Sequence, residues 1–212
     1  MSITVLDKEA MVDGVNYLSS LNANLSKFLK SYNVPTLPVE KNYFWALCRS
    51  VIYQQISGKA AKKISDRYLS LYANGDRMLP SEVIDIDIKK IFKVGISRQK
   101  ASYIKNIAHA FNMKIIDEKN ISKLDDQEII NQLTTIKGVG RWTAEMFLIF
   151  TLRRSDIFPV TDLGIQKGFK IFYSLDDLPT IELMNKKSEL WKPYRTIMSL
   201  YLWYAVEGPF EW

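Results

Sequence analysis

Apolar residues recur at helical spacing along most of this chain, with short breaks between the repeats. Phe44, Leu47 and Val51 fall on one side of a helix over 42–55, and a second such face runs through 98–111. The alternation of apolar and polar residues that marks a strand is weak. The sequence therefore predicts an all-α protein.

Proline, glycine and capping residues divide the chain into helical segments. The expected segments are 7–29 (one or two helices), 42–55, 58–72, a short helix from Pro80, 98–111, 128–136, 142–152, 164–172 and a final helical region from 179 to 207. The 212 residues show no linker or internal repeat. We expect a single domain over 1–212, a two-lobed helical bundle with a groove between the lobes.

Composition narrows the function classes. The formal net charge of +6 favours a polyanionic partner such as nucleic acid, although a scattered surplus would also suit a solvated surface. The lone cysteine, Cys48, allows no internal disulfide and no iron-sulfur cluster held by four cysteines. The lone histidine, His109, fits a helix surface better than a ligand or a catalytic base. We therefore expect no transition metal and no organic cofactor.

The chain carries no targeting or membrane signal that we recognise. Its start, MSITVLDKEA, lacks a basic region followed by a long apolar run. The most apolar segments, 146–152 and 197–206, are shorter than the roughly 20 residues that span a bilayer. We expect a soluble intracellular protein, cytoplasmic in a prokaryote or nuclear in a eukaryote.

A glycine turn joins two expected helices in the segment 126–152. The stretch Lys137-Gly138-Val139-Gly140 precedes a helix with Trp142 in its first turn. Backbone N–H groups at such a helix start lack intrahelical partners and bind anions, and glycines let a DNA phosphate approach. On its own, however, the pattern fits an ordinary glycine-capped corner between helices better than a phosphate site.

Five sequence blocks carry a resemblance to a known family. They are VIYQQISGKAAKKI (51–64), GISRQKASYIKNIA (95–108), IKGVGRWTAEMF (136–147), FPVTDLGIQKGF (158–169) and WKPYRTIMSLYLWYAVEG (191–208). In this order they resemble the helix-hairpin-helix (HhH-GPD) DNA glycosylases. The chain looks most like the 3-methyladenine DNA glycosylase II group of alkylation-repair enzymes, in a compact form without the N-terminal sheet domain of some bacterial members.

The resemblance implies a monofunctional glycosylase for base excision repair. Such an enzyme hydrolyses the N-glycosidic bond of alkylated purines in duplex DNA and leaves an abasic site. Asp162 matches the family's catalytic carboxylate, which stabilises the positive charge that builds on the deoxyribose. Asp162 also precedes an apolar-periodic segment and would serve as a helix N-cap, and both roles are compatible.

The resemblance assigns a base pocket to Trp142, Trp203, Met146 and Leu163. Relatives that also cut the backbone have a Schiff-base lysine where this chain has Trp142, so no lyase activity is expected. The two tryptophans match base-stacking residues and would attract a cationic alkylated purine. Without the resemblance, Trp203 would be interpreted as an ordinary core residue. Met146 and Leu163 depart from the family's usual residues, which leaves the range of accepted bases open.

The remaining assignments concern the DNA strand. Gln55 and Gln54 match the wedge that fills the gap left by an extruded base, although a helix end explains them equally well. The expected phosphate contacts are Lys137, Gly138, Gly140, Thr143 and Arg98. The family further suggests a monovalent cation, Na⁺ or K⁺, at the backbone carbonyls of Thr134 and Ile136. Lys137 stands where the family usually has proline.

Two alternatives remain open at this stage. One is a glycosylase for another lesion, such as uracil, hypoxanthine or oxidised guanine. The other is a non-enzymatic helix-hairpin-helix protein that only binds DNA, which Asp162 and Trp142 together disfavour. In every case duplex DNA is the expected partner, no membrane is involved, and a monomer is expected.

Overall fold

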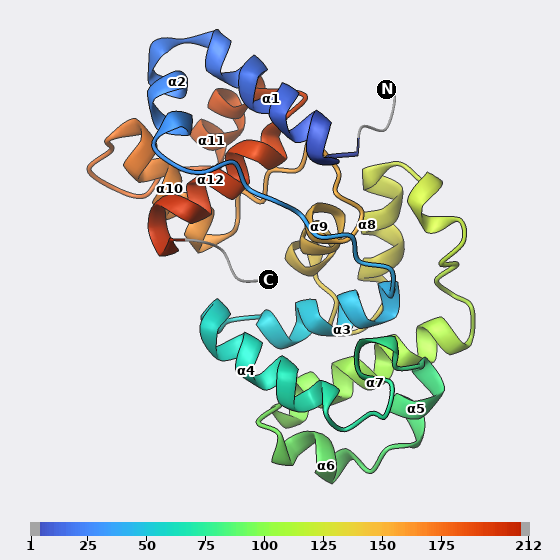
Figure 1. The fold of residues 1–212 in the computed structure, drawn as a ribbon. Helices are drawn as coiled ribbons and strands as arrows, with labels where there is room; N and C mark the ends of the chain where they lie inside the picture. The colour runs from blue at the N-terminus through green and yellow to red at the C-terminus, as the bar shows by residue number, and fades with distance from the viewer. Residues whose placement is uncertain (1–4, 209–212) are drawn as a thin grey trace. The chain divides into compact units, whose positions relative to one another are not determined.

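The computed structural model describes residues 5–208, and the chain divides into two compact units (Figure 1). Within the described residues, the first unit combines 5–38 with 148–208, and the second covers 39–147. Each unit buries its own apolar side chains, so each has a core of its own.

Regular structure within residues 5–208 is helical, apart from one antiparallel bridge between Val5 and Arg154. The predicted all-α class is therefore confirmed. The α-helices are α1 Lys8–Leu21, α2 Ala23–Lys30, α3 Tyr43–Tyr53, α4 Gly58–Leu69, α5 Pro80–Asp85, α6 Ile88–Lys93, α7 Arg98–Asn112, α8 Asp126–Thr134, α9 Arg141–Phe150, α10 Leu163–Tyr173, α11 Ile181–Ser188 and α12 Arg195–Glu207. Single 3-10 turns lie at η1 Gly75–Arg77, η2 Ile121–Lys123 and η3 Glu189–Trp191.

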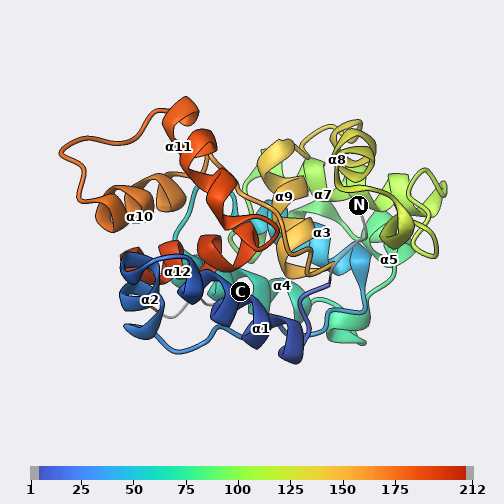
Figure 2. The same ribbon diagram turned by 90° about the horizontal axis from the view of Figure 1, so that it is seen from above.

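The first unit is built on the close packing of α10 against α12 and of α1 against α2 (Figures 1 and 2). Gly168 permits the close approach of α10 to α12, because a Cβ at that position would overlap the backbone carbonyl of Leu202. The indole of Trp191 is fully buried against an aromatic cluster that includes Phe158 and Phe169. Asp162, the predicted catalytic carboxylate, lies at the N-terminus of α10.

The second unit is organised around α3, which packs against α4 and α7. The predicted apolar faces are the buried ones: Phe44, Leu47 and Val51 are each at most 1% exposed. Phe44 contacts Phe111 of α7, with ring centroids 5.5 Å apart. The helical spacing of apolar residues thus identified the surfaces that these two helices bury.

One expected segment resolves an alternative that the sequence left open, and two others are divided more finely than predicted. The segment 7–29 becomes α1 and α2, because Asn22 is extended and its side chain accepts a hydrogen bond from the Leu25 N–H. The region from Pro80 contains two short helices, α5 and α6. The final region is interrupted before α12 around Pro193, which has no N–H to continue a helix.

Three further local features concern the cap of α8, the lone histidine and the lone cysteine. Asp125, not Asp126, caps α8: its Oδ1 accepts from the Glu128 N–H at 2.8 Å, and Glu128 Oε2 accepts from the Asp125 N–H at 2.9 Å. His109 is exposed on α7, as predicted. Cys48 is fully buried in α3, and this burial raises the pKa of its thiol well above the ordinary value.

Candidate active site

The glycine turn between α8 and α9 is built tightly against α7 of the same unit. Gly138 has φ of +104°, and a Cβ there would overlap the ring of Tyr103. Asn106 Nδ2 donates a 2.9 Å hydrogen bond to the Lys137 carbonyl. Two side chains of α7 therefore shape the turn, and only glycine meets both demands at position 138.

The predicted phosphate-binding residues of the turn differ in accessibility. Lys137 and Gly140 are exposed, and a Cβ at Gly140 would meet no atom within 4 Å. Thr143, in the first turn of α9, is only 1% exposed, and its hydroxyl accepts from Gln54 Nε2 at 2.9 Å. The Thr143 side chain is therefore engaged within the protein, and only its backbone N–H remains a candidate for binding a phosphate.

The two predicted wedge glutamines have different environments. Gln54 Nε2 donates to the Gly138 carbonyl at 3.1 Å and to Thr143 Oγ1. Gln55 is exposed and has φ of +58°, which is uncommon for a residue other than glycine. The structure therefore uses the Gln54 side chain to brace the hairpin, whereas Gln55 extends from the loop after α3.

Basic residues of α7 also divide into two groups. Arg98 is the exposed first residue of α7, and its guanidinium lies 5.9 Å from the ring centroid of Phe92. Lys100 Nζ instead donates to the carbonyls of Ile52 and Gln54 at 2.8 and 2.7 Å, and burial lowers the pKa of this ammonium. Arg98 stays a candidate phosphate contact, while Lys100 stabilises the end of α3.

The candidate cation site lies at the end of α8. Thr134 is the last residue of that helix, and its hydroxyl donates to the Ile130 carbonyl at 2.8 Å. The Ile136 carbonyl accepts from the Val139 N–H at 2.9 Å. Among the described residues, no group of three or more histidine, cysteine, aspartate or glutamate side chains is arranged to hold a metal ion.

Asp162 caps α10, and its carboxylate is fixed by donors from two helices. Oδ1 accepts from the backbone N–H of Ile165 at 2.8 Å and from the indole Nε1–H of Trp203 on α12 at 2.8 Å. The N-cap interpretation of Asp162 is thus confirmed, and the same oxygen carries the second bond. Asp162 itself is only partly buried, so its carboxylate is not enclosed in the core.

The four predicted pocket residues are not equally exposed. Trp142 is half-buried in the first turn of α9, whereas Met146 is fully buried one turn further on. Trp203 is 3% exposed and stacks on Phe150, with ring centroids 5.8 Å apart. Leu163, directly after Asp162, is 52% exposed. Two of the four side chains are therefore open to solvent in this structure.

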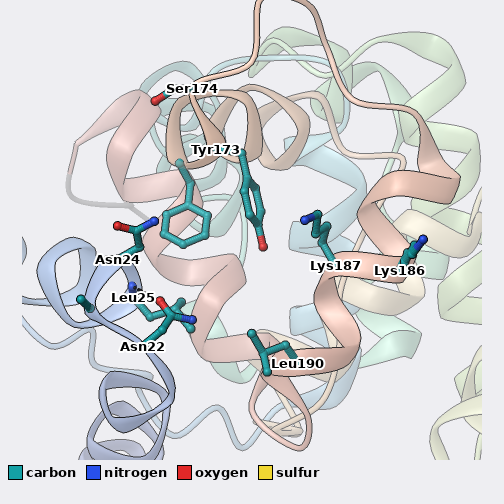
Figure 3. A pocket seen from close by; sticks show the side chains of 10 residues that line it. Asn22, Asn24, Leu25, Tyr173, Ser174, Lys186, Lys187 and Leu190 are labelled. Carbon is teal, nitrogen blue, oxygen red and sulfur yellow. Dashed lines mark hydrogen bonds between the residues drawn. The ribbon is translucent and has the colours of Figure 1, made fainter.

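A hollow of about 700 Å³ lies at the other end of α10 (Figure 3). Tyr173, Lys187 and Leu190 face it, and Lys187 Nζ lies 5.5 Å from the centroid of the Tyr173 ring. At 1.5 Å per residue the helix is about 16 Å long. None of the predicted site residues lines this hollow, so it is separate from the carboxylate at the helix N-terminus.

Tyr103 and Asn106 contribute to the turn but were not predicted to. Helical periodicity gave no sign that either residue contacts the turn. Their roles depend on contacts between segments far apart in the chain.

None of the helices in the described part of the chain combines the length and apolar character needed to cross a membrane.

Comparison with known proteins agrees with the all-helical fold. Residues 48–193 match the family described as HhH-GPD superfamily base excision DNA repair protein. The chain is 35% identical to DNA-3-methyladenine glycosylase 1 of Schizosaccharomyces pombe, over 96% of this chain and 92% of that protein. It is 32% identical to DNA-3-methyladenine glycosylase of Saccharomyces cerevisiae, over 86% of this chain and 72% of that protein.

A solved structure extends the similarity to three dimensions. The 3-methyladenine DNA glycosylase Mag1 of Schizosaccharomyces pombe, in complex with abasic DNA, superposes with a TM-score of 0.86 at 36% identity, covering 91% of this chain and 95% of that one. The chain belongs to the HhH-GPD superfamily of base excision DNA repair proteins. The family membership predicted from the five sequence blocks is confirmed.

Proposed function

We propose that this protein is a monofunctional DNA glycosylase that removes alkylated purines of the 3-methyladenine type from duplex DNA and leaves an abasic site. The observation that carries the proposal is the Asp162 carboxylate, fixed at the N-terminus of α10 by Ile165 N–H and Trp203 Nε1–H. The names of the two yeast relatives and the abasic DNA bound to Mag1 support the same reaction.

Asp162 would act on the bond between base and sugar. Breaking that bond builds positive charge on the deoxyribose, and a carboxylate nearby stabilises this oxocarbenium-like state. The same carboxylate would orient the attacking water or accept its proton. Because two donors already hold Oδ1, the carboxylate needs little reorganisation as the charge develops.

The hairpin turn would hold the DNA strand while the base is extruded. Gly140, where a Cβ would meet no atom within 4 Å, allows close approach of a phosphate to the start of α9. Gly138 gives the turn its left-handed backbone conformation, and Lys137 and Arg98 add positive charge. We assign the wedge to Gln55, because it is exposed, whereas the Gln54 amide is engaged by the hairpin.

Trp142 supports hydrolysis without strand cleavage. A lyase of this family needs an amine to form a Schiff base with the sugar, and an indole cannot provide one. Its half-buried ring, in the first turn of α9, offers a surface on which a cationic alkylated purine would stack. We therefore expect intact strands, each with an abasic site, as the product.

The test is release of bases from duplexes that each contain one defined lesion. The panel contains alkylated purines together with uracil, hypoxanthine and 8-oxoguanine, and alkali afterwards reveals abasic sites. Wild type should excise the alkylated purines, and Asp162→Asn should lose at least about 100-fold in rate while still binding an abasic duplex.

Each alternative predicts a different result from the same panel. Preferential release of uracil, hypoxanthine or 8-oxoguanine would show that the enzyme's substrate is that lesion and not an alkylated purine. Equal release by wild type and Asp162→Asn would refute the catalytic assignment. Binding of lesion duplexes with no release at all would favour a protein that only binds DNA, and strand breaks before alkali would contradict the role given to Trp142.

We also propose that the protein acts as a monomer wherever the genome is held, in the cytoplasm of a prokaryote or the nucleus of a eukaryote. A Na⁺ or K⁺ ion bridging the carbonyls of Thr134 and Ile136 to a phosphate would be its sole cofactor. Replacing K⁺ with a bulky organic cation at constant ionic strength should then weaken DNA binding. Unchanged affinity would remove the ion from the proposal.

A further inference from the structure

Gly164 is the second residue of α10 and lies directly beside the candidate catalytic carboxylate. A Cβ at this position would be 2.8 Å from Trp203 Cδ1, 3.0 Å from Trp203 Nε1 and 3.0 Å from Asp162 Oδ1. The backbone of Gly164 is helical, so its conformation is open to any residue. The space around it is what demands glycine.

The atoms that a side chain would meet are held in place. Trp203 is 3% exposed and stacks on Phe150 at an interplanar angle of 29°, so its ring has little room to move aside. Asp162 Oδ1 is tied to the first turn of α10 through Ile165 N–H. A methyl group at position 164 would therefore push the indole and the carboxylate apart.

We infer that Gly164 is a positioning residue for the reaction: by lacking a side chain, it lets Trp203 Nε1–H reach Asp162 Oδ1. The inference rests on the proposed glycosylase function and adds a role for Trp203 beyond base stacking. A hydrogen bond to a carboxylate from a neutral donor on a neighbouring helix fixes the direction of that carboxylate.

The two bonds to Oδ1 have different consequences when lost. The bond from Ile165 N–H is local and needs only a capped helix, so it can persist after a change at Trp203 or Gly164. The bond from Trp203 joins α10 to α12 and is the one that a side chain at 164 would break. A variant can therefore keep its helices and lose the alignment of Asp162.

The experiment compares four full-length variants with wild type: Gly164→Ala, Trp203→Phe, the double variant, and Ile171→Ala. Ile171 is an exposed residue of α10, so its replacement controls for a new alanine in the same helix. Single-turnover excision from methylated duplex reports on chemistry, and affinity for an abasic duplex reports on binding. The indole N–H signal of Trp203 in a ¹⁵N-correlation spectrum reports on the hydrogen bond, with Asp162→Asn as reference.

Gly164→Ala and Trp203→Phe should each slow excision roughly 10- to 100-fold, with affinity for the abasic duplex close to wild type. Both variants should also lower Tm, through overpacking at 164 and lost packing at 203, so excision is compared at a temperature where all variants are folded. In the Trp203→Phe background, adding Gly164→Ala should cost little more, because the bond it would break is already absent. The Trp203 indole signal should shift in both Gly164→Ala and Asp162→Asn, and Ile171→Ala should match wild type throughout.

Additive losses in the double variant, or wild-type excision by Gly164→Ala, would overturn the inference and leave the glycosylase function intact. An indole signal unchanged in both Gly164→Ala and Asp162→Asn would overturn it independently of activity. If wild type itself releases no alkylated base, the proposed function fails, and the inference fails with it. Should Gly164→Ala not fold, Trp203→Phe alone still decides whether the indole donor matters for rate.

Discussion

Gly138 shows how two separate constraints can act on one residue. Its φ of +104° lies where side chains are unfavourable, and a Cβ would overlap the Tyr103 ring. We expect Gly138→Ala to lower the free energy of unfolding by about 2 kcal/mol or more. Urea denaturation of Gly138→Ala beside Gly140→Ala, which meets no atom within 4 Å, measures this. Equal midpoints for the two variants would contradict the structure around the turn.

The single cysteine gives a second prediction for one residue. Cys48 is fully buried, and burial raises the pKa of its thiol, so little thiolate forms at neutral pH and reagents cannot reach it. A disulfide reagent should leave the native protein unmodified over minutes and label it stoichiometrically in denaturant, as followed by intact mass. Rapid labelling of the native protein would show that α3 is less closely packed than the structure indicates.

Individual residues were predicted best where their effect is local. Asp162 as an N-cap and His109 on a helix surface follow from neighbouring residues alone. The Gln54 side chain could not be placed this way, because its partners, Gly138 and Thr143, lie more than 80 positions further along the chain.

At the scale of elements, Gln54 joins the end of α3 to the hairpin, whereas the adjacent Gln55 is exposed. Gln54→Ala removes two hydrogen bonds to the hairpin and should cost about 1–2 kcal/mol of stability. Gln55→Ala removes an exposed side chain, so stability should change by less than about 0.5 kcal/mol while excision slows.

Thermal denaturation and single-turnover excision of the two variants separate these effects. The reverse outcome would be a destabilised Gln55→Ala protein and a stable but slow Gln54→Ala protein. It would show that Gln55 stabilises the hairpin and that Gln54 is the wedge. A matched pair of neighbouring residues of the same type makes the comparison direct, because composition and chain position are nearly constant.

Elements were predicted in kind more reliably than in extent. Apolar spacing located α3 and α7 and the faces they bury, since that pattern is the cause of their burial. The division of the final region into α11, η3 and α12 was missed, although Pro193 marks the interruption in the sequence.

For the whole molecule, the effect of the six surplus positive charges on DNA binding depends on where those charges lie. If Lys137 and Arg98 contact phosphates, replacing either by alanine should lower the slope of log affinity against log salt by about 1. Lys186 lines the hollow at the far end of α10, and Lys186→Ala serves as the matched control. Binding titrations at several salt concentrations measure all three, and equal slopes would show that net charge alone drives binding.

The sequence by itself determined the helical class, the family and the residue types at the hairpin and at Asp162, because these depend on periodicity, capping and local motifs. Only the tertiary structure decided which groups hold the carboxylate and the turn. Trp203 reaches Asp162 across 41 positions, and Tyr103 fills the space at Gly138 across 35. Such contacts arise when packed helices bring distant residues together, and no local pattern in the chain encodes that proximity.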